Sequence, residues 1–260
     1  MEYFVFHFEK FLLVFVRIMG VFFTVSFFSS DALPETIRLG LIFLITATIY
    51  PLVSAFVPEP SSNMIEYGLY ALGEGVIGIA IGMIMSVYFT VFQLAGQFFS
   101  VQMGFGASEV FDPLSQISLP IMGQFLYMIF TLVFMLGNGP AYILNGLFES
   151  FSRVNFVDLL RTSMTGSKYG LLSSMGDLFI VALKISFPIL AMLLFVSVTQ
   201  GLLAKASPQM NLQAVGFQIS IFIGFVIFMA VSPALVNIIG NIIEYTFENV
   251  LNLMAEMGDG

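Results

Sequence analysis

Charged residues divide this chain into long uncharged stretches. These stretches cover residues 18–30, 39–58, 75–108, 113–148, 185–204 and 206–243. A membrane-spanning helix needs about 20 consecutive apolar residues, and all but the first stretch reach that length. Strand-like alternation is not evident, whereas a membrane β-barrel would show alternating segments of about ten residues. We therefore predict an all-α, membrane-associated protein with roughly six hydrophobic segments, at about 11–30, 39–58, 65–103, 116–148, 178–204 and 211–245.

The third of these segments is too long for a simple membrane span. No proline interrupts it between Ile65 and Met103. A helix of that length measures about 58 Å at 1.5 Å per residue, whereas the hydrocarbon layer is about 30 Å thick. The helix must tilt steeply, break at its glycines or extend beyond the bilayer.

Composition supports the membrane assignment and excludes several functions. Hydrophobic residues make up 58% of the chain and charged residues only 9%, whereas soluble domains carry about 25% charged residues. The net charge of −8 argues against nucleic acid as a partner. Because there is no cysteine and His7 is the only histidine, thiol chemistry and metal clusters built of several histidines are excluded. We expect no catalytic residue, no cofactor and no metal site, and we expect that the protein is not an enzyme.

Glycines crowd the start of the third segment. Gly73, Gly75, Gly78 and Gly82 lie within ten residues, and Gly96 follows further along. Glycines let helix backbones approach closely in a membrane, where the hydrophobic effect does not drive helices together. Two interpretations remain open, namely packing between helices of this chain and packing against another subunit.

Five charged residues lie within or beside the apolar segments: Arg17, Arg38, Glu74, Asp177 and Lys184. Ionisable groups in a membrane interior are expensive and are candidates for a functional role. A proton or ion relay would use such groups. Ion pairs between helices, or side chains that reach the interface from segment ends, would also account for these charges, and we favour that structural interpretation.

The stretch GFGASEVFDP separates two long apolar segments. Its glycines, acids and proline predict a flexible loop at a helix end, with the candidate residues Gly104, Phe105, Gly106, Glu109, Phe111, Asp112 and Pro113. The loop is either a plain connection or a segment that lines a cavity, because irregular backbone at membrane depth is tolerated only when it is buried in protein or lines a cavity.

An ordered series of motifs resembles the FliR family of flagellar type III export-gate proteins and their virulence-secretion (SctT-like) counterparts. The series is Arg17, LPETIRLG with Pro34 and Arg38, Pro51, GEGVIGIAIG (73–82), LAGQFFSVQMGFG (94–106), FDP (111–113), NG (138–139), ESF (149–151) and GLLAKASPQMNLQAVGFQI (201–219). The last string is the most specific, and the series covers most of the chain. The chain departs from the family pattern at Phe27-Phe28 and at Pro140.

The resemblance implies a single export-gate domain over residues 1–260, built of long helical hairpins, in a multi-pass protein of the bacterial inner membrane and flagellar basal body. FliR-like proteins form the secretion pore with FliP-like and FliQ-like subunits, next to FlhB-like and FlhA-like proteins. Unfolded flagellar proteins pass through this pore, and membrane lipid surrounds the complex. The loop matching Gly104–Pro113 would be part of the plug that closes the pore. The turn formed by Pro208, Gln209, Met210 and Asn211 would position the last hairpin against its neighbours.

Two alternatives to a flagellar gate subunit remain. The virulence counterpart shares the same motifs, so we favour the flagellar system only because flagellar members are the more abundant ones. A self-contained secondary transporter would use Glu74, Asp177 and Lys184 as coupling residues, but the inverted repeats expected of such a transporter are not visible.

Overall fold

The computed structural model of the chain describes residues 2–26, 28, 34–59, 63–105, 121–154, 168–206 and 212–258. These residues form seven helices, and none of them lies in a strand. In chain order the helices are α1 (Glu2–Thr24), α2 (Glu35–Val53), α3 (Met64–Met103), α5 (Ile121–Leu136), α6 (Gly139–Arg153), α8 (Lys168–Ala206) and α9 (Leu212–Gly258). The prediction of an all-α protein is confirmed.

The fourth predicted segment, 116–148, contains two helices instead of one. Helix α5 ends at Leu136, and Asn138 adopts a left-handed conformation with φ of 59°. Asparagine tolerates this conformation better than most residues. Pro140 then lies in the first turn of α6, where its missing N–H is not needed. The Asn-Gly-Pro sequence therefore ends one helix and starts the next.

Helix α3 shows how the overlong third segment is built. It is one helix of 40 residues, about 60 Å long at 1.5 Å per residue. Its glycines do not break it, so that option is wrong. The ends of four other segments also differ from expectation, since α1 stops at Thr24, α2 spans Glu35–Val53, α8 begins at Lys168 and α9 continues to Gly258.

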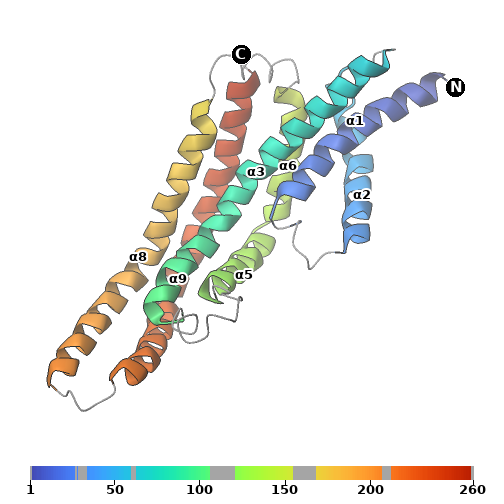
Figure 1. Cartoon of the computed structure of the whole chain (residues 1–260). Coiled ribbons are helices and arrows are strands. Elements are labelled where there is room, and N and C mark those ends of the chain that lie inside the picture. The colour runs from blue at the N-terminus through green and yellow to red at the C-terminus, as the bar shows by residue number, and fades with distance from the viewer. Residues whose placement is uncertain are drawn as a thin grey trace. The chain divides into compact units, whose positions relative to one another are not determined.

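The described residues group into two compact units. The first contains Met1–Tyr88, Asn138–Met175 and Ile243–Gly260, and the second contains Phe89–Gly137 and Gly176–Ile242. In the first unit α1 packs against α2, and in the second α8 and α9 form a hairpin (Figure 1). The prediction of one domain over the whole chain stays a prediction.

Each unit has an apolar core of its own. The first buries Leu13 and Val21 of α1, Ile42 of α2, Ile77 of α3 and Leu147 of α6. In the second, phenylalanine rings fill the space between α3 and α5, where Phe92 stacks on Phe130 with ring centroids 4.3 Å apart. Stacked and edge-to-face ring pairs stabilise such cores beyond the area that they bury.

Four helices are long and apolar enough to cross a membrane: Glu35–Val53, Met64–Met103, Phe179–Ala206 and Val215–Ile243. The number rises to five if α5 and α6 count together as one broken span. The described residues therefore offer four or five spans against the six hydrophobic segments that the sequence suggested.

Candidate functional site

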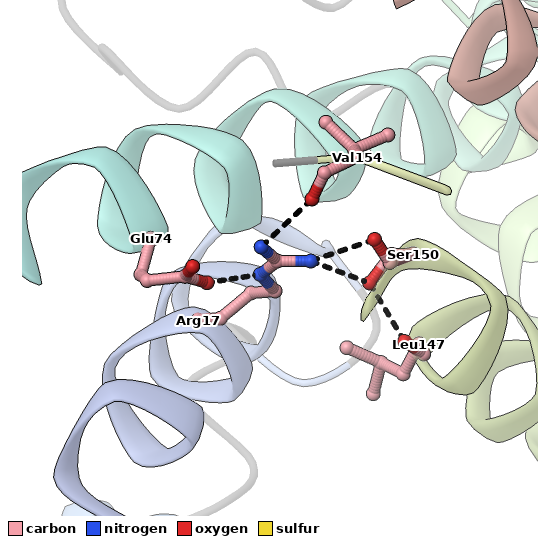
Figure 2. A network of polar contacts seen from close by, with 5 residues as sticks. All are labelled: Arg17, Glu74, Leu147, Ser150 and Val154. Carbon is pink, nitrogen blue, oxygen red and sulfur yellow. Dashed lines mark hydrogen bonds and ion pairs between the residues drawn. The ribbon is translucent and has the colours of Figure 1, made fainter. Parts of the chain in front are cut away.

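Two buried charges meet in the first unit. Arg17 of α1 is 1% exposed and Glu74 of α3 is 2% exposed. The Nε of Arg17 donates a hydrogen bond to Oε2 of Glu74, so the two side chains form a buried ion pair (Figure 2). This places Arg17 and Glu74, both predicted from the sequence as charges in apolar surroundings, in one cluster.

The other donors of Arg17 reach the end of α6. Nη1 donates to the carbonyl oxygen of Ser150 at 2.7 Å, and Nη2 donates to the carbonyl oxygen of Val154 at 3.1 Å. The Arg17 guanidinium also lies over the ring of Phe151, with Cζ 4.2 Å from the ring centroid. The carbonyl group of Ser150 also accepts the N–H of Val154 at 3.1 Å. The carbonyl groups at the C-terminal end of a helix carry partial negative charge, so a cation is favourable there. Arg17 therefore caps the C-terminus of α6 from a different helix.

This network holds three helices in fixed positions. Glu74 supplies the counter-charge from α3, and the carbonyl groups of Ser150 and Val154 at the end of α6 accept from Nη1 and Nη2 of Arg17. Removing one member of a buried ion pair leaves the other charge uncompensated and costs about 3–5 kcal/mol. Arginine does not lose its proton in proteins, so the pair suits a structural connection better than proton transfer.

A glycine seam joins α1 to α3 beside this network. A Cβ added to Gly78 would lie 2.2 Å from the carbonyl oxygen of Arg17, and one added to Gly82 would lie 2.8 Å from Cβ of Thr24. A Cβ added to Gly20 would lie 2.9 Å from the carbonyl oxygen of Gly75. These distances leave no room for a side chain, so the two backbones are in contact.

The seam continues beyond the glycines. The hydroxyl groups of Ser26 and Ser86 form a hydrogen bond one turn further along α3 from Gly82. Gly73 is buried in the same helix. Four predicted glycines thus lie on or beside the part of α3 that faces α1 or the buried interior of this unit: Gly73, Gly75, Gly78 and Gly82.

A second close approach lies in the other unit, between α3 and α5. A Cβ added to Gly96 would lie 2.5 Å from both Cα of Gly123 and the carbonyl oxygen of Met122. Gly96 therefore packs within the chain in this structure. Gly123 was not singled out from the sequence, although its position next to a long apolar run is typical of such contacts.

The C-terminal end of α3 is a well-formed helix cap. Gly104 has a φ of +93°. Its N–H donates to the carbonyl oxygen of Val101 at 3.1 Å, and the N–H of Phe105 donates to the carbonyl oxygen of Ser100 at 3.2 Å. This is the Schellman pattern, in which a glycine in the left-handed conformation ends the helix. The stretch predicted as a loop therefore begins at a defined point.

Helix α9 packs against this cap. A Cβ added to Gly104 would lie 2.5 Å from Cδ1 of Phe217, and one added to Gly224 would lie 2.6 Å from Cε of Met103. Phe217 and Gly224 are seven residues apart and so share one face of α9. The hairpin itself is joined by Gln200, whose Nε2 donates to the carbonyl oxygen of Gly216 at 3.0 Å and to Oγ of Ser220 at 3.1 Å.

Several predicted residues take other positions or cannot be placed. Arg38 is buried in α2, with Cζ 5.5 Å from the ring centroid of Phe23. Lys184 is exposed on α8. Asp177 lies in α8, but its side chain is outside the described part. Nine further candidate residues lie outside the described part altogether: Gly106, Glu109, Phe111, Asp112, Pro113, Pro208, Gln209, Met210 and Asn211.

Comparison with known proteins identifies the family. The sequence model of the family described as bacterial export proteins, family 1, matches residues 8–246. The chain belongs to this family. The match includes Arg17, Glu74 and Ser150 of the buried network and both glycine contacts of α3, so these features lie within the family's own region.

Individual relatives agree with this assignment. The chain is 31% identical over 255 residues to the flagellar biosynthetic protein FliR of Bacillus subtilis, which covers 96% of each chain. It is 32% identical over 196 residues to FliR of Borreliella burgdorferi, covering 75% of this chain and 73% of the relative. Identity to FliR of Escherichia coli is 25% over 247 residues, covering 93% and 90%. The resemblance to the FliR family is confirmed, and the chain is a membrane-embedded export protein.

Proposed function

We propose that this protein is a structural and gating subunit of the flagellar type III export gate, and that it forms the secretion pore with FliP-like and FliQ-like subunits. The observation that carries the proposal is the alignment with Bacillus subtilis FliR over 96% of both chains. An alignment of that extent leaves little of the chain for a different activity. The location that follows is the bacterial inner membrane, in the flagellar basal body beside FlhB-like and FlhA-like proteins.

The geometry of the described residues suits a wall more than a catalyst. The buried charges Arg17 and Glu74 are used to join helices, and the glycines of α3 bring backbones into contact. Among the described residues, no group of three or more His, Asp or Glu is arranged to hold a metal ion. A subunit of this kind needs no chemistry of its own, because the energy for export is supplied by other components.

The relatives favour the flagellar system over the virulence one. The Bacillus, Borreliella and Escherichia proteins all carry the name flagellar biosynthetic protein FliR. The secondary-transporter alternative loses one of its coupling residues, because Glu74 is engaged by a buried arginine. Unfolded flagellar proteins are therefore the proposed cargo.

Closure of the pore is assigned to the stretch that starts at the α3 cap. Gly104 and Phe105 form a fixed helix end against Phe217 of α9, and the sequence up to Pro113 has the glycine and acid content of a loop. We propose that this loop resists leakage until a substrate arrives.

Co-purification tests the proposal. The chain, carrying an affinity tag, is produced with the FliP-like and FliQ-like proteins of the same bacterium and purified in mild detergent, and native mass spectrometry reports the composition. We expect one complex that contains all three proteins in fixed ratio, and none of the partners in a preparation with an untagged chain. A chain that elutes alone when all three are present contradicts the proposal.

A further inference from the structure

One row of positions along α3 changes its chemistry half-way. Residues that are alternately four and three positions apart lie on one side of a helix. Six such positions in the first half of α3 are apolar and between 46% and 75% exposed: Ile65, Leu69, Leu72, Val76, Ile79 and Met83. The same spacing continues through four uncharged polar residues: Ser86, Thr90, Gln93 and Gln97. The row is therefore apolar up to Met83 and polar beyond it.

Three residues of the polar half lie on the open side of α3. The hydroxyl group of Ser86 is hydrogen-bonded to that of Ser26 on α1, which places Ser86 in the contact between these helices. Thr90 and Gln97 are exposed, and Gln93 is half-buried. We call Thr90, Gln93 and Gln97 the polar stripe.

The neighbours of the polar stripe include apolar and polar side chains. Leu94 is half-buried and Val101 is exposed, so the open side of α3 is not polar throughout. On α5, Gln124 is exposed and follows directly after Gly123, which contacts Gly96 of α3. A further exposed amide group therefore lies close to the polar stripe, on a different helix.

Hydrocarbon is a poor environment for the polar stripe. A glutamine amide group carries two N–H donors and an acceptor oxygen, and an unsatisfied polar group in an apolar medium costs several kcal/mol. Polar residues in the apolar helices of membrane proteins face the protein interior or a water-filled cavity, and they mark substrate paths. Water or another protein therefore suits this side of α3 better than lipid does.

The point where the chain leaves α3 favours water. Gly104 ends the helix seven residues after Gln97, so it follows Gln97 by two turns on the same side. The loop to which we assign closure of the pore starts there. Because a segment that closes a pore has to face it, the side of α3 that carries the polar stripe faces the pore as well.

An unfolded polypeptide matches the chemistry of the polar stripe. Every cargo residue except proline offers a main-chain N–H and a carbonyl group, and amide and hydroxyl side chains donate and accept hydrogen bonds. No residue from Gly75 to Ser108 carries a charge, so the stripe does not select cargo by its charge. Passage through a pore also requires contacts that are weak enough to release what they bind.

We propose that Thr90, Gln93 and Gln97 line the water-filled pore and form transient hydrogen bonds with the main chain of the unfolded polypeptide that passes through it. This assignment rests on the proposed function and deepens it, because it names residues that touch the cargo. The apolar half of the same row, Ile65–Met83, is not part of this path.

Photo-crosslinking in the source bacterium tests the contact with cargo. The crosslinking residue p-benzoylphenylalanine is introduced singly at residues 90, 93 and 97 of the complementing gene. The cargo is a filament protein fused to a stably folded domain, which holds it in the gate. Residues 72, 76 and 79, in the apolar half of the row, are the matched controls. After irradiation, cross-linked products are identified with antibodies against the cargo.

We expect cargo to be cross-linked from residues 90 and 97 several-fold more than from residues 72, 76 and 79. Products that contain another gate subunit in place of cargo would mean that a subunit covers the polar stripe. Equal yields from both halves would mean that the polar half is not special. Either result overturns the assignment.

The outcome can be separated from that of the proposed function. Secretion of flagellar proteins that continues in a strain lacking the gene contradicts the proposed function, and the assignment is then overturned with it. Secretion that depends on the gene, without a cargo product from residue 90 or 97, overturns the assignment alone.

Cysteine modification provides a second measurement, because the chain has no cysteine of its own. Thr90→Cys and Gln97→Cys are compared with Val76→Cys and Ile79→Cys in the purified export complex. The complex is held in lipid nanodiscs, in which both faces are open to buffer. We expect a water-soluble sulfonated maleimide to react several-fold faster at residues 90 and 97. Equally slow reaction at all four positions means that lipid or a subunit shields the polar stripe, and overturns the assignment.

Discussion

Arg17 donates a hydrogen bond to the carbonyl oxygen of Val154, which lies 137 positions further along the chain and 3.1 Å from Nη2. Val154 is the first residue after α6. The contact therefore joins a helix near the N-terminus to the point where the chain leaves α6. Arg17 therefore caps α6 in addition to forming an ion pair with Glu74, whereas Glu74 contributes only to the ion pair.

Exchanging the two charges should not restore stability. Arg17→Ala is expected to lower the free energy of unfolding by about 3–5 kcal/mol, because Glu74 is left buried without a counter-charge. In the double variant Arg17→Glu/Glu74→Arg, a carboxylate at position 17 cannot donate to the carbonyl groups of Ser150 and Val154 and lies near their partial negative charge. Thermal melting in detergent should show the double variant well below the parent.

The exposed pair Arg153–Glu149 is the control for this measurement. It lies on α6 at 2.9 Å between Nε and Oε2, and exposed pairs contribute about 0–1 kcal/mol. Arg153→Gln should therefore melt close to the parent. Full recovery of stability by the double exchange would show that only the ion pair matters and that the cap on α6 does not.

The α1–α3 seam should not accept a side chain. Gly78→Leu is expected to destabilise the protein by about 3 kcal/mol or more, because its Cβ alone would overlap the backbone of Arg17. Gly40→Leu is the matched control, since a Cβ at Gly40 meets nothing within 4 Å. Equal melting temperatures of the two variants would contradict the seam.

The α3 cap should respond to substitution in two separable ways. Gly104→Ala is strained by the positive φ, at about 1–2 kcal/mol, and its Cβ also meets the ring of Phe217. Adding Phe217→Ala removes the overlap but not the backbone strain. In a double-mutant cycle of melting temperatures we expect a partial rescue. Strict additivity of the two changes would show that Phe217 does not press on the cap.

Shortening the proposed plug should make the gate leak. Deletion of residues 106–112 leaves the described helices and the α3 cap in place, so assembly with partner subunits should persist. Ion conductance of the purified complex in planar bilayers is expected to rise in the closed state. A complex of normal composition with unchanged conductance would contradict the plug.

The sequence predicted the helical class because charge positions and apolar length depend only on local composition. It also identified Arg17, Glu74 and the glycines of α3 as unusual, since charges and glycines in apolar helices carry a cost that needs a reason. It could not identify their partners. The closest acceptors of Arg17 at the end of α6 are main-chain carbonyl groups, which every residue has.

One further feature could have been predicted from the sequence, and another could not. Helix α1 carries two small residues four positions apart, Gly20 and Thr24, which is the same spacing as that of Gly78 and Gly82 in α3. These two residues form the other side of the seam. The break at Gly137 and Asn138 was hidden because the apolar run continues on both sides of it. A run of hydropathy reports length but not the backbone conformation of one asparagine.

The role in flagellar export is tested most directly by an in-frame deletion in the source bacterium, complemented by the intact gene. Hook and filament proteins in the medium are quantified, and filaments are counted by electron microscopy. We expect secretion and filaments to be lost in the deletion strain and restored by the gene. Normal filaments and a normal set of secreted flagellar proteins in the deletion strain would contradict the account.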